Sequence, residues 1–192
     1  FKMMNIDFET VDIDYFTQGQ QSPEFMAINP NASLPALTDG DLKLWESNAI
    51  LQYGADKTGD TTAYPTDLKV RADINRWLLW EANMWFPSCY VYLVENVVKP
   101  LLGAEPDQAI LDGESERFNK LAGILNDQLA SGDWVSSSGP TIADIAVAAP
   151  MHLHSQQKLP LDDYANTRAW IARLEEQPFW KSTDVAPLLG LG

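Results

Sequence analysis

Apolar and acidic residues alternate with a period of two near the start of the chain, which is typical of β-structure. Residues 6–13 predict a strand with one exposed face. The apolar runs at 34–38 and 42–45 predict two further strands, and Asp39-Gly40 between them favours a tight turn with positive φ. The first third of the chain is therefore expected to contain a small sheet with a hairpin.

Three signals predict helix ends in the same third. Asn5 is expected to stop a helical turn formed by the first residues. Ser22 and Pro23 predict a short helix with the serine as its N-cap. Ser47 is predicted to be the N-cap of a longer helix that begins with residues 48–53. Strands and helices together predict an α/β fold for this part.

Farther along the chain the apolar residues recur at helical spacing. Helices are expected at 67–86 and 88–98, with a kink or break at Pro87 between them. Thr141 and Asp144 have the spacing of a capping box and predict the start of a buried helix. The remaining predicted helices cover 107–129, 145–149 behind the capping box, and 166–175.

Residues 58–66 separate the strand-containing part of the chain from the part with helical spacing. They are rich in turn formers and show no apolar period. We therefore predict an α/β domain at 1–57, a linker at 58–66 and an all-helical domain at 67–192. No internal repeat divides the chain further.

Composition narrows the classes of function. Hydrophobic residues make up 45% of the 192 residues, which excludes a disordered chain. A formal net charge of −14 argues against nucleic acid and anionic membranes as partners. The single cysteine, Cys89, cannot form an internal disulfide, and no signal peptide or membrane span is visible, so a cytoplasmic protein is expected. His152 and His154 point to opposite sides of a helix, so no metal site is expected.

The stretch 29–51 carries the most specific chemistry. Glu46 and Ser47 stand at a predicted helix start, whose unpaired N–H groups favour a carboxylate, and the side-chain carboxylate would pair with an ammonium group. A cis bond between Leu34 and Pro35 would turn the backbone N–H and C=O of Leu34 outward, where an extended peptide could pair with them. These residues could hold the amino-acid end of a small zwitterion. An ordinary hairpin followed by a capped helix is the alternative.

This stretch resembles the glutathione-binding segment of the glutathione transferases. The resemblance rests on Asn-Pro, an aliphatic residue before a cis-proline, and Glu-Ser opening a helix, and it extends from about Ile6 to about Trp180. Thr-Ile-Ala-Asp at 141–144 resembles the C-terminal domain signature of the same family. The resemblance implies a thioredoxin-like first domain and an all-helical second domain, in a homodimeric enzyme of the bacterial cytosolic type.

The resemblance also implies how glutathione would bind. Leu34, bent by Pro35, would pair through its backbone with the cysteinyl part, and Glu46 and Ser47 would hold the γ-glutamyl end. Gln21 stands where many relatives carry a cation near the glycine carboxylate. Charge-assisted hydrogen bonds are about twice as strong as neutral ones, so weak affinity for glutathione is expected.

Relatives in this family begin with a strand and most of a helix that have no counterpart here. The serine, tyrosine or cysteine that activates the glutathione sulfur lies just beyond that strand. The sulfur-activating residue is therefore expected before Phe1, and no residue of this sequence is assigned the role. The alternative is a family member that never had the segment.

Four residues of the second predicted domain are assigned by the resemblance to the pocket for a hydrophobic electrophile: Asn83, Trp85, Phe86 and Cys89. An aromatic pattern at helical spacing also fits a buried core. Nothing near Cys89 in the sequence would lower the pKa of its thiol, so this cysteine is expected to be buried and inert.

Two functions from different classes follow. The first is a detoxifying glutathione transferase that joins the glutathione thiolate to a small electrophile without a metal. The second is a noncatalytic, transferase-like binding or scaffold protein. Gln20 and Gln21 favour the second, whereas the pair Glu46 and Ser47 favours the first. A glutathione-dependent isomerase or reductase on the same fold is a third, weaker interpretation.

Overall fold

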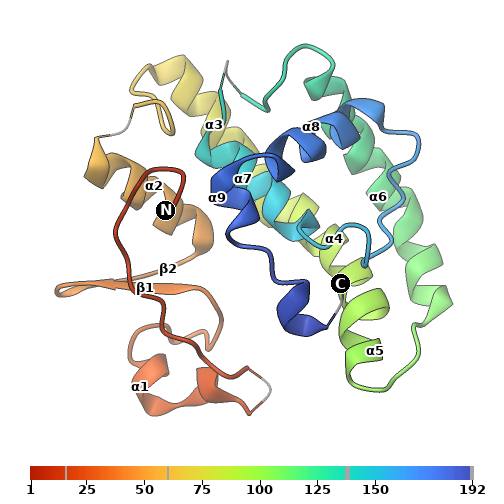
Figure 1. Ribbon diagram of the computed structural model, residues 1–192, viewed down its shortest axis with the longest axis horizontal. Coiled ribbons are helices and arrows are strands. Elements are labelled where there is room, and N and C mark those ends of the chain that lie inside the picture. The colour runs from red at the N-terminus through yellow and green to blue at the C-terminus, as the bar shows by residue number, and fades with distance from the viewer. Residues whose placement is uncertain (16, 60, 137–138, 191–192) are drawn as a thin grey trace. The chain divides into compact units, whose positions relative to one another are not determined.

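The computed structural model describes residues 1–15, 17–59, 61–136 and 139–190 (Figure 1). The chain folds into two compact units, Phe1–Pro65 and Thr66–Gly192. We describe each unit by itself.

The first unit is built around an antiparallel hairpin of β1 (Ala36–Asp39) and β2 (Leu42–Trp45). The helix α2 (Ser47–Thr58) follows β2 directly and packs against both strands (Figure 1). Ala36 lies opposite Trp45 in the ladder, so the open end of the hairpin faces the start of α2. The predicted hairpin and the helix after it are confirmed.

The hairpin turn lies one residue later than the sequence predicts. Asp39 pairs with Leu42, which leaves Gly40 and Asp41 as the two turn residues. Gly40 has a φ of 57°, in the left-handed region that glycine enters without steric cost.

The strand predicted at residues 6–13 is not formed. The described part of the chain contains a single sheet, the two-stranded β1–β2 hairpin, and no strand lies hydrogen-bonded beside 6–13. Alternation of side chains reports that one face is exposed, but a strand also needs a neighbour for its backbone groups. Residues 2–5 form a turn and no helix, but Asn5 ends it as a helix stop would, with a φ of 52° and a hydrogen bond from Ile6 N–H to Phe1 C=O at 3.0 Å.

Two short helical segments precede the hairpin, η1 (Gly19–Gln21) and α1 (Pro23–Met26). Ser22 is the N-cap of α1, as predicted, and its Oγ accepts a hydrogen bond from the N–H of Phe25 at 3.2 Å. Phe25 is buried, so this cap also fixes an apolar anchor.

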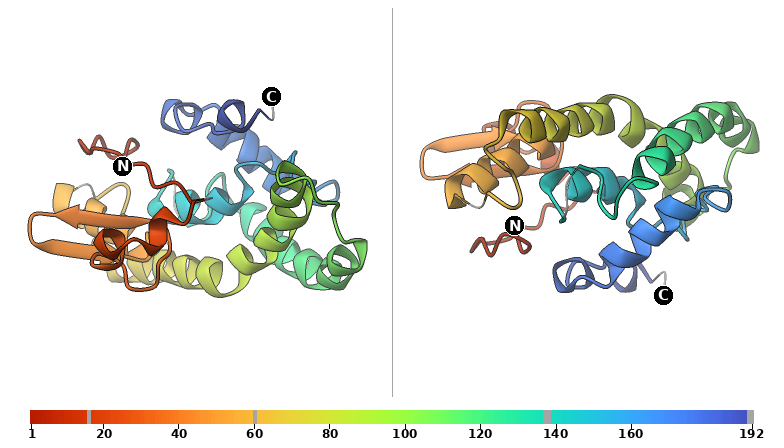
Figure 2. Two further views of the ribbon diagram at one scale, coloured as in Figure 1. Left: turned by 90° about the horizontal axis from the view of Figure 1, so that it is seen from below. Right: turned by 90° about the horizontal axis from the view of Figure 1, so that it is seen from above.

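The second unit starts with one continuous helical run, drawn in yellow and green in Figure 2. It consists of α3 (Leu68–Trp80), η2 (Glu81–Trp85), α4 (Phe86–Leu93), η3 (Val94–Val98) and α5 (Lys99–Leu101). Of the predicted kink or break at Pro87, the break is not formed: the α-helical pattern changes to π-helical in η2 and η3, and each ends two residues before a proline, Pro87 or Pro100. The wider π-turn gives room for a ring that would strike a carbonyl in a regular α-helix.

The other predicted helices of the second unit are confirmed, and α6 and α8 run side by side (Figure 2). The longer ones are α6 (Gln108–Leu129), α7 (Ile142–Ala148) and α8 (Ala165–Glu175). The short ones are η4 (Ala149–Met151), α9 (Pro178–Lys181) and η5 (Pro187–Leu189).

Trp85 lies at the centre of the second unit's core, with none of its surface exposed. Its ring stacks on Trp80 with centroids 5.6 Å apart, and it lies 5.2 Å from the ring of Phe118. Its indole N–H donates to the carbonyl of Val147 at 3.0 Å, so the polar atom of this large side chain is satisfied inside the core.

The predicted capping box at the start of α7 is present. Thr141 Oγ1 accepts from the N–H of Ala143 at 3.2 Å, and Asp144 accepts from the N–H of Thr141 at 2.9 Å. Asp144 is fully buried and also accepts from the N–H of Val135 and from the indole N–H of Trp170. One carboxylate therefore joins α7, α8 and the loop between α6 and α7.

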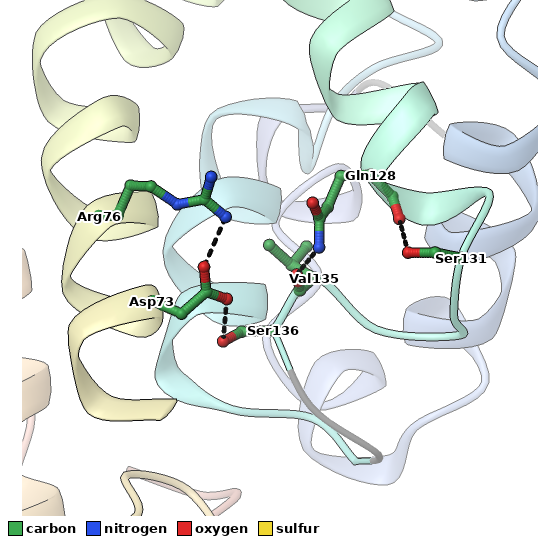
Figure 3. A network of polar contacts seen from close by, with 6 residues as sticks. All are labelled: Asp73, Arg76, Gln128, Ser131, Val135 and Ser136. Atoms are coloured by element: carbon green, nitrogen blue, oxygen red, sulfur yellow. Dashed lines mark hydrogen bonds and ion pairs between the residues drawn. The ribbon is translucent and has the colours of Figure 1, made fainter. Parts of the chain in front are cut away.

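Figure 3 shows how the described part of that loop is held from the other side. The Ser136 hydroxyl donates to the carboxylate of Asp73 in α3 at 2.7 Å, and Arg76 donates to the same carboxylate. The amide of Gln128 in α6 donates to the carbonyl of Val135 at 2.9 Å. The loop is thus fixed at Val135 and Ser136 to α6 and α3.

Candidate functional site

The register of the hairpin brings the two halves of the predicted site to one end. Ala36 is paired with Trp45. Residues two positions before Ala36 and two positions after Trp45 leave the ladder at the same end, since antiparallel strands advance by equal steps. Leu34 and Ser47, thirteen residues apart in sequence, therefore both lie just beyond the open end of the hairpin, with Glu46 between the strand and the helix.

Leu34 offers an open peptide group at this end. The Leu34–Pro35 bond is cis, as predicted, and the side chain of Leu34 is 47% exposed. Within the described ranges, neither the N–H nor the C=O of Leu34 makes a hydrogen bond. The loop before it is fixed by the buried Asn29, whose Nδ2 donates to the carbonyl of Ser33 at 2.7 Å. An extended ligand can thus pair with Leu34 as a further strand would.

Glu46 has an unusual backbone conformation, with φ 71° and ψ 111°. A residue other than glycine in such a region costs about 1–3 kcal/mol, and such residues cluster at functional sites. Its carboxylate is exposed and makes no hydrogen bond to the part of the chain that is described. The strained backbone therefore presents a free anionic group beside the open end of the hairpin.

The prediction that Ser47 is the N-cap of α2 is wrong. Ser47 is the first helical residue, Glu46 holds the cap position, and neither side chain makes a capping hydrogen bond. A capping serine needs extended backbone angles, but here the chain enters the helix through the left-handed turn at Glu46. The N–H of Ser47, the first of α2, is consequently open to an anion, with the exposed Ser47 hydroxyl next to it.

A carboxylate at the far end of β1 anchors α2 to the hairpin. Asp39 accepts a hydrogen bond from the Tyr53 hydroxyl at 2.6 Å and forms an ion pair with Lys57. Lys57 first, and then Tyr53, holds the pKa of Asp39 below its ordinary value, and the same contacts raise the pKa of Lys57 and of Tyr53. This contact fixes the helix whose first turn forms the site.

Asp39→Asn is expected to lower the melting temperature at neutral pH, with an effect that shrinks in acid. The folded-state pKa of Asp39 is depressed, so its contribution is present above the unfolded value of about 4 and is lost as pH falls through the folded value. Thermal melts between pH 7 and pH 2 measure this difference, with Asp41→Asn in the exposed turn as the control. A difference that stays constant down to pH 2 would contradict the assignment.

The predicted pocket residues of the second unit fall into two groups. Asn83 and Phe86 are exposed, and the ring of Phe86 is 44% accessible. Trp85 and Cys89 have no exposed surface, so neither can contact a ligand in this conformation. Burial, followed by the nearby carboxylate of Glu81, raises the pKa of the Cys89 thiol well above its usual value, so the expectation of an inert thiol is confirmed.

Sequence reasoning missed Tyr90, which shares a helix face with Phe86. The two rings stack with centroids 5.5 Å apart, and Tyr90 is 46% exposed. Leu79, on the same helical run, is 65% exposed, and its carbonyl accepts a hydrogen bond from Asn83. The signal in the sequence is the spacing of four residues, which places the two aromatic side chains on one face of a helix.

Among the described residues there is neither a candidate metal site nor a membrane-spanning helix. No three or more His, Cys, Asp or Glu side chains there are arranged to hold a metal ion. None of the helices in those ranges is both long enough and apolar enough to cross a bilayer.

The amino-acid sequence matches one protein family along both units. Residues 1–56 match the family described as "Glutathione S-transferase, N-terminal domain", and residues 89–178 match "Glutathione S-transferase, C-terminal domain". A probable glutathione S-transferase from Oryza sativa subsp. japonica is 30% identical over 186 residues, covering 95% of this chain and 86% of the relative. Glutathione S-transferase 1 from Zea mays is 30% identical over 174 residues, covering 90% and 81%. These relatives are plant proteins, and the expected bacterial type stays a prediction.

Solved structures agree with the sequence comparison. A glutathione S-transferase-I bound with lactoylglutathione superposes with a TM-score of 0.84 at 28% identity, covering 94% of this chain and 88% of that one. A maize glutathione S-transferase I in complex with an atrazine–glutathione conjugate gives a TM-score of 0.82 at 28% identity, covering 99% and 88%. The expected fold, a thioredoxin-like domain followed by a helical domain, is confirmed.

Proposed function

Because the chain belongs to the glutathione S-transferase family, we propose that the open end of its hairpin holds glutathione for conjugation to a small hydrophobic electrophile. The protein is a transferase, and glutathione is its co-substrate. One observation carries the proposal: the uncapped start of α2, with the free Glu46 carboxylate and Ser47 hydroxyl, lies at the same hairpin end as the unpaired peptide group of Leu34.

The γ-glutamyl and cysteinyl residues of glutathione each have matching groups at this end. The α-carboxylate of the γ-glutamyl residue accepts hydrogen bonds from the N–H of Ser47 at the start of α2 and from the Ser47 hydroxyl. The α-ammonium group pairs with the carboxylate of Glu46. The cysteinyl residue pairs through its backbone with Leu34, which the bend at Pro35 turns outward. Three points of attachment fix the position of the sulfur.

Positioning is the contribution that these residues make to the reaction. The thiol loses its proton, the thiolate sulfur forms a bond to the electrophilic carbon, and the leaving group departs with its bonding electrons. Holding the two reactants in line replaces a bimolecular encounter, which can lower the barrier by several kcal/mol. None of the residues at the hairpin end is assigned the role of activating the sulfur.

The exposed aromatic pair of the helical unit is proposed to contact the electrophile. Phe86 and Tyr90 present stacked rings, and Asn83 adds an exposed amide on the same helical run. Flat, apolar molecules pack well against such rings. The maize relative that binds an atrazine–glutathione conjugate supports this class of substrate.

Phe86→Ala is expected to raise KM for an apolar aryl chloride about five- to tenfold and to leave KM for glutathione unchanged. The reason is the loss of about 1–1.5 kcal/mol of apolar contact at a half-exposed ring. Initial rates at varied concentrations of each substrate measure the effect. Ile124→Ala, an exposed apolar residue on α6, is the matched control. An equal rise in both KM values would contradict a role specific to the electrophile.

The direct test of the function is product formation by the natural protein with glutathione and an aryl chloride. The expected result is a conjugate of the calculated mass, together with one chloride released per sulfur bond formed. Absence of product despite glutathione binding would favour the noncatalytic alternative. The two plant relatives are both named glutathione S-transferases, which supports the catalytic function over the noncatalytic alternative.

Three further proposals concern the biological role, the cellular location and the oligomeric state. We propose a role in detoxification, by analogy with the conjugate that the maize relative binds. The lone cysteine and the net charge of −14 support a cytoplasmic protein. Homodimerisation rests on the family resemblance, and light scattering at several concentrations tests it.

A further inference from the structure

We infer that the proposed site does not recognise the third residue of its tripeptide by charge, and that it takes γ-glutamylcysteinyl thiols with an uncharged third residue about as well as glutathione. This inference rests on the proposed function. It names the class of co-substrate, which the family alone does not decide for this chain.

The first argument is the supply of cations in the first unit. It contains three lysines and no arginine, against seven Asp and three Glu. Lys43 donates to the carbonyl of Ala27 at 2.9 Å, and Lys57 is paired with Asp39. Lys2 also takes part in a polar interaction. Glutathione carries two carboxylates and one ammonium group, and the start of α2 with Ser47 provides for one carboxylate only.

The second argument is the direction in which the ligand extends. With the γ-glutamyl end at Ser47 and the cysteinyl residue at Leu34, the third residue continues past Leu34 by about 3.5 Å. The neighbouring backbone on that side is the loop of Asn29, which is hydrogen-bonded to Ser33. That loop is the continuation of α1 and η1, so the third residue extends toward the segment 19–29.

The third argument is the chemistry of that segment. It contains one charged residue, the acidic Glu24. Gln21 is exposed and neutral. Gln20 is only 6% exposed, and its Oε1 has no hydrogen-bond partner in the part of the chain that the structure describes. The Gln20 Oε1 atom is buried and out of reach of a ligand, so this segment offers the third residue only neutral groups and the acidic Glu24.

The test compares three ligands by calorimetry with the natural protein at low ionic strength. They are glutathione, its C-terminal amide and its glycine ethyl ester; the third residue is anionic in the first and uncharged in the other two. The expected dissociation constants agree within about threefold. A preference of tenfold or more for glutathione would overturn the inference while leaving the proposed function intact. No binding of any of the three would overturn both.

A charge variant locates the third residue independently. Gln21→Lys is expected to tighten glutathione binding about two- to fivefold, the range of an exposed ion pair, and to leave the amide unchanged. Thr10→Lys adds the same charge to an exposed residue of the same unit and is the control. An equal gain for glutathione in both variants, or no gain in Gln21→Lys, would overturn the placement of the third residue at this segment.

Discussion

Replacing Asp144 by alanine is expected to lower the free energy of unfolding by about 3–5 kcal/mol, because the buried carboxylate satisfies four donors at once. Val135 N–H and the Trp170 indole bind one oxygen at 2.8 and 3.0 Å. The N–H and hydroxyl of Thr141 bind the other at 2.9 and 3.1 Å. Each donor left unpaired in the core costs about 1–3 kcal/mol, partly recovered by relaxation.

Denaturant unfolding of the natural protein and the Asp144→Ala variant measures this loss. Asp127→Ala, an exposed acid on α6, removes the same charge and should change stability by less than about 0.5 kcal/mol. Asp144→Asn should lie between the two, because its amide keeps one acceptor but faces the Thr141 N–H with a second donor. If Asp144→Ala lost under about 1 kcal/mol, the carboxylate would not be the junction that its contacts indicate.

Replacing Glu46 by alanine is expected to weaken glutathione binding about 10- to 100-fold, the second large effect. The variant removes a charge-assisted contact to the α-ammonium group, worth about 1.5–3 kcal/mol. Ser47→Ala removes a neutral hydroxyl and should cost about five- to tenfold. Calorimetric titration with glutathione measures both losses.

Two further variants separate charge from backbone strain. Asp41→Ala removes an acid from the turn at the other end of the same hairpin, so it should leave glutathione affinity within about twofold. Glu46→Gly relieves the positive φ of 71° and should not lower stability, yet it should lose as much affinity as Glu46→Ala. If Asp41→Ala and Glu46→Ala lost the same glutathione affinity, the overall negative charge of the unit would account for the effect, and a specific contact of Glu46 with the ammonium group would not.

The parts of the fold that local chemistry determines could be predicted from the sequence. Ser22, Asp107 and Thr141 begin helices because their side chains satisfy the first N–H groups, and that signal lies within a few residues. The hairpin followed from alternation around a glycine turn. The resemblance to the family anticipated the cis bond before Pro35.

The errors arose where a distant partner or a backbone adjustment decides the outcome. Residues 6–13 alternate like a strand, but no described strand lies beside them. Pro87 stays inside a helical run because a π-turn precedes it. The resemblance assigned both Trp85 and Phe86 to the pocket, whereas the alternative of a buried core at helical spacing holds for Trp85.

The sequence identified two residues of the candidate site, but not the backbone conformation that positions them. Glu46 and Ser47 were identified as a pair, yet the serine was expected to cap the helix. The left-handed backbone of Glu46 prevents that and leaves both side chains free, and a backbone angle of this kind leaves no mark on the sequence of a non-glycine residue.

The most direct test of the central claim is a calorimetric cycle with two ligands and two proteins. The ligands are glutathione and glutaryl-cysteinylglycine, which is glutathione without its α-ammonium group; the proteins are the natural one and Glu46→Ala. If Glu46 holds the ammonium group, the natural protein binds the second ligand about 10- to 100-fold more weakly, and Glu46→Ala binds the two within about threefold. If Glu46→Ala still discriminates as strongly as the natural protein, the ammonium group is held elsewhere and the assignment of this site is wrong.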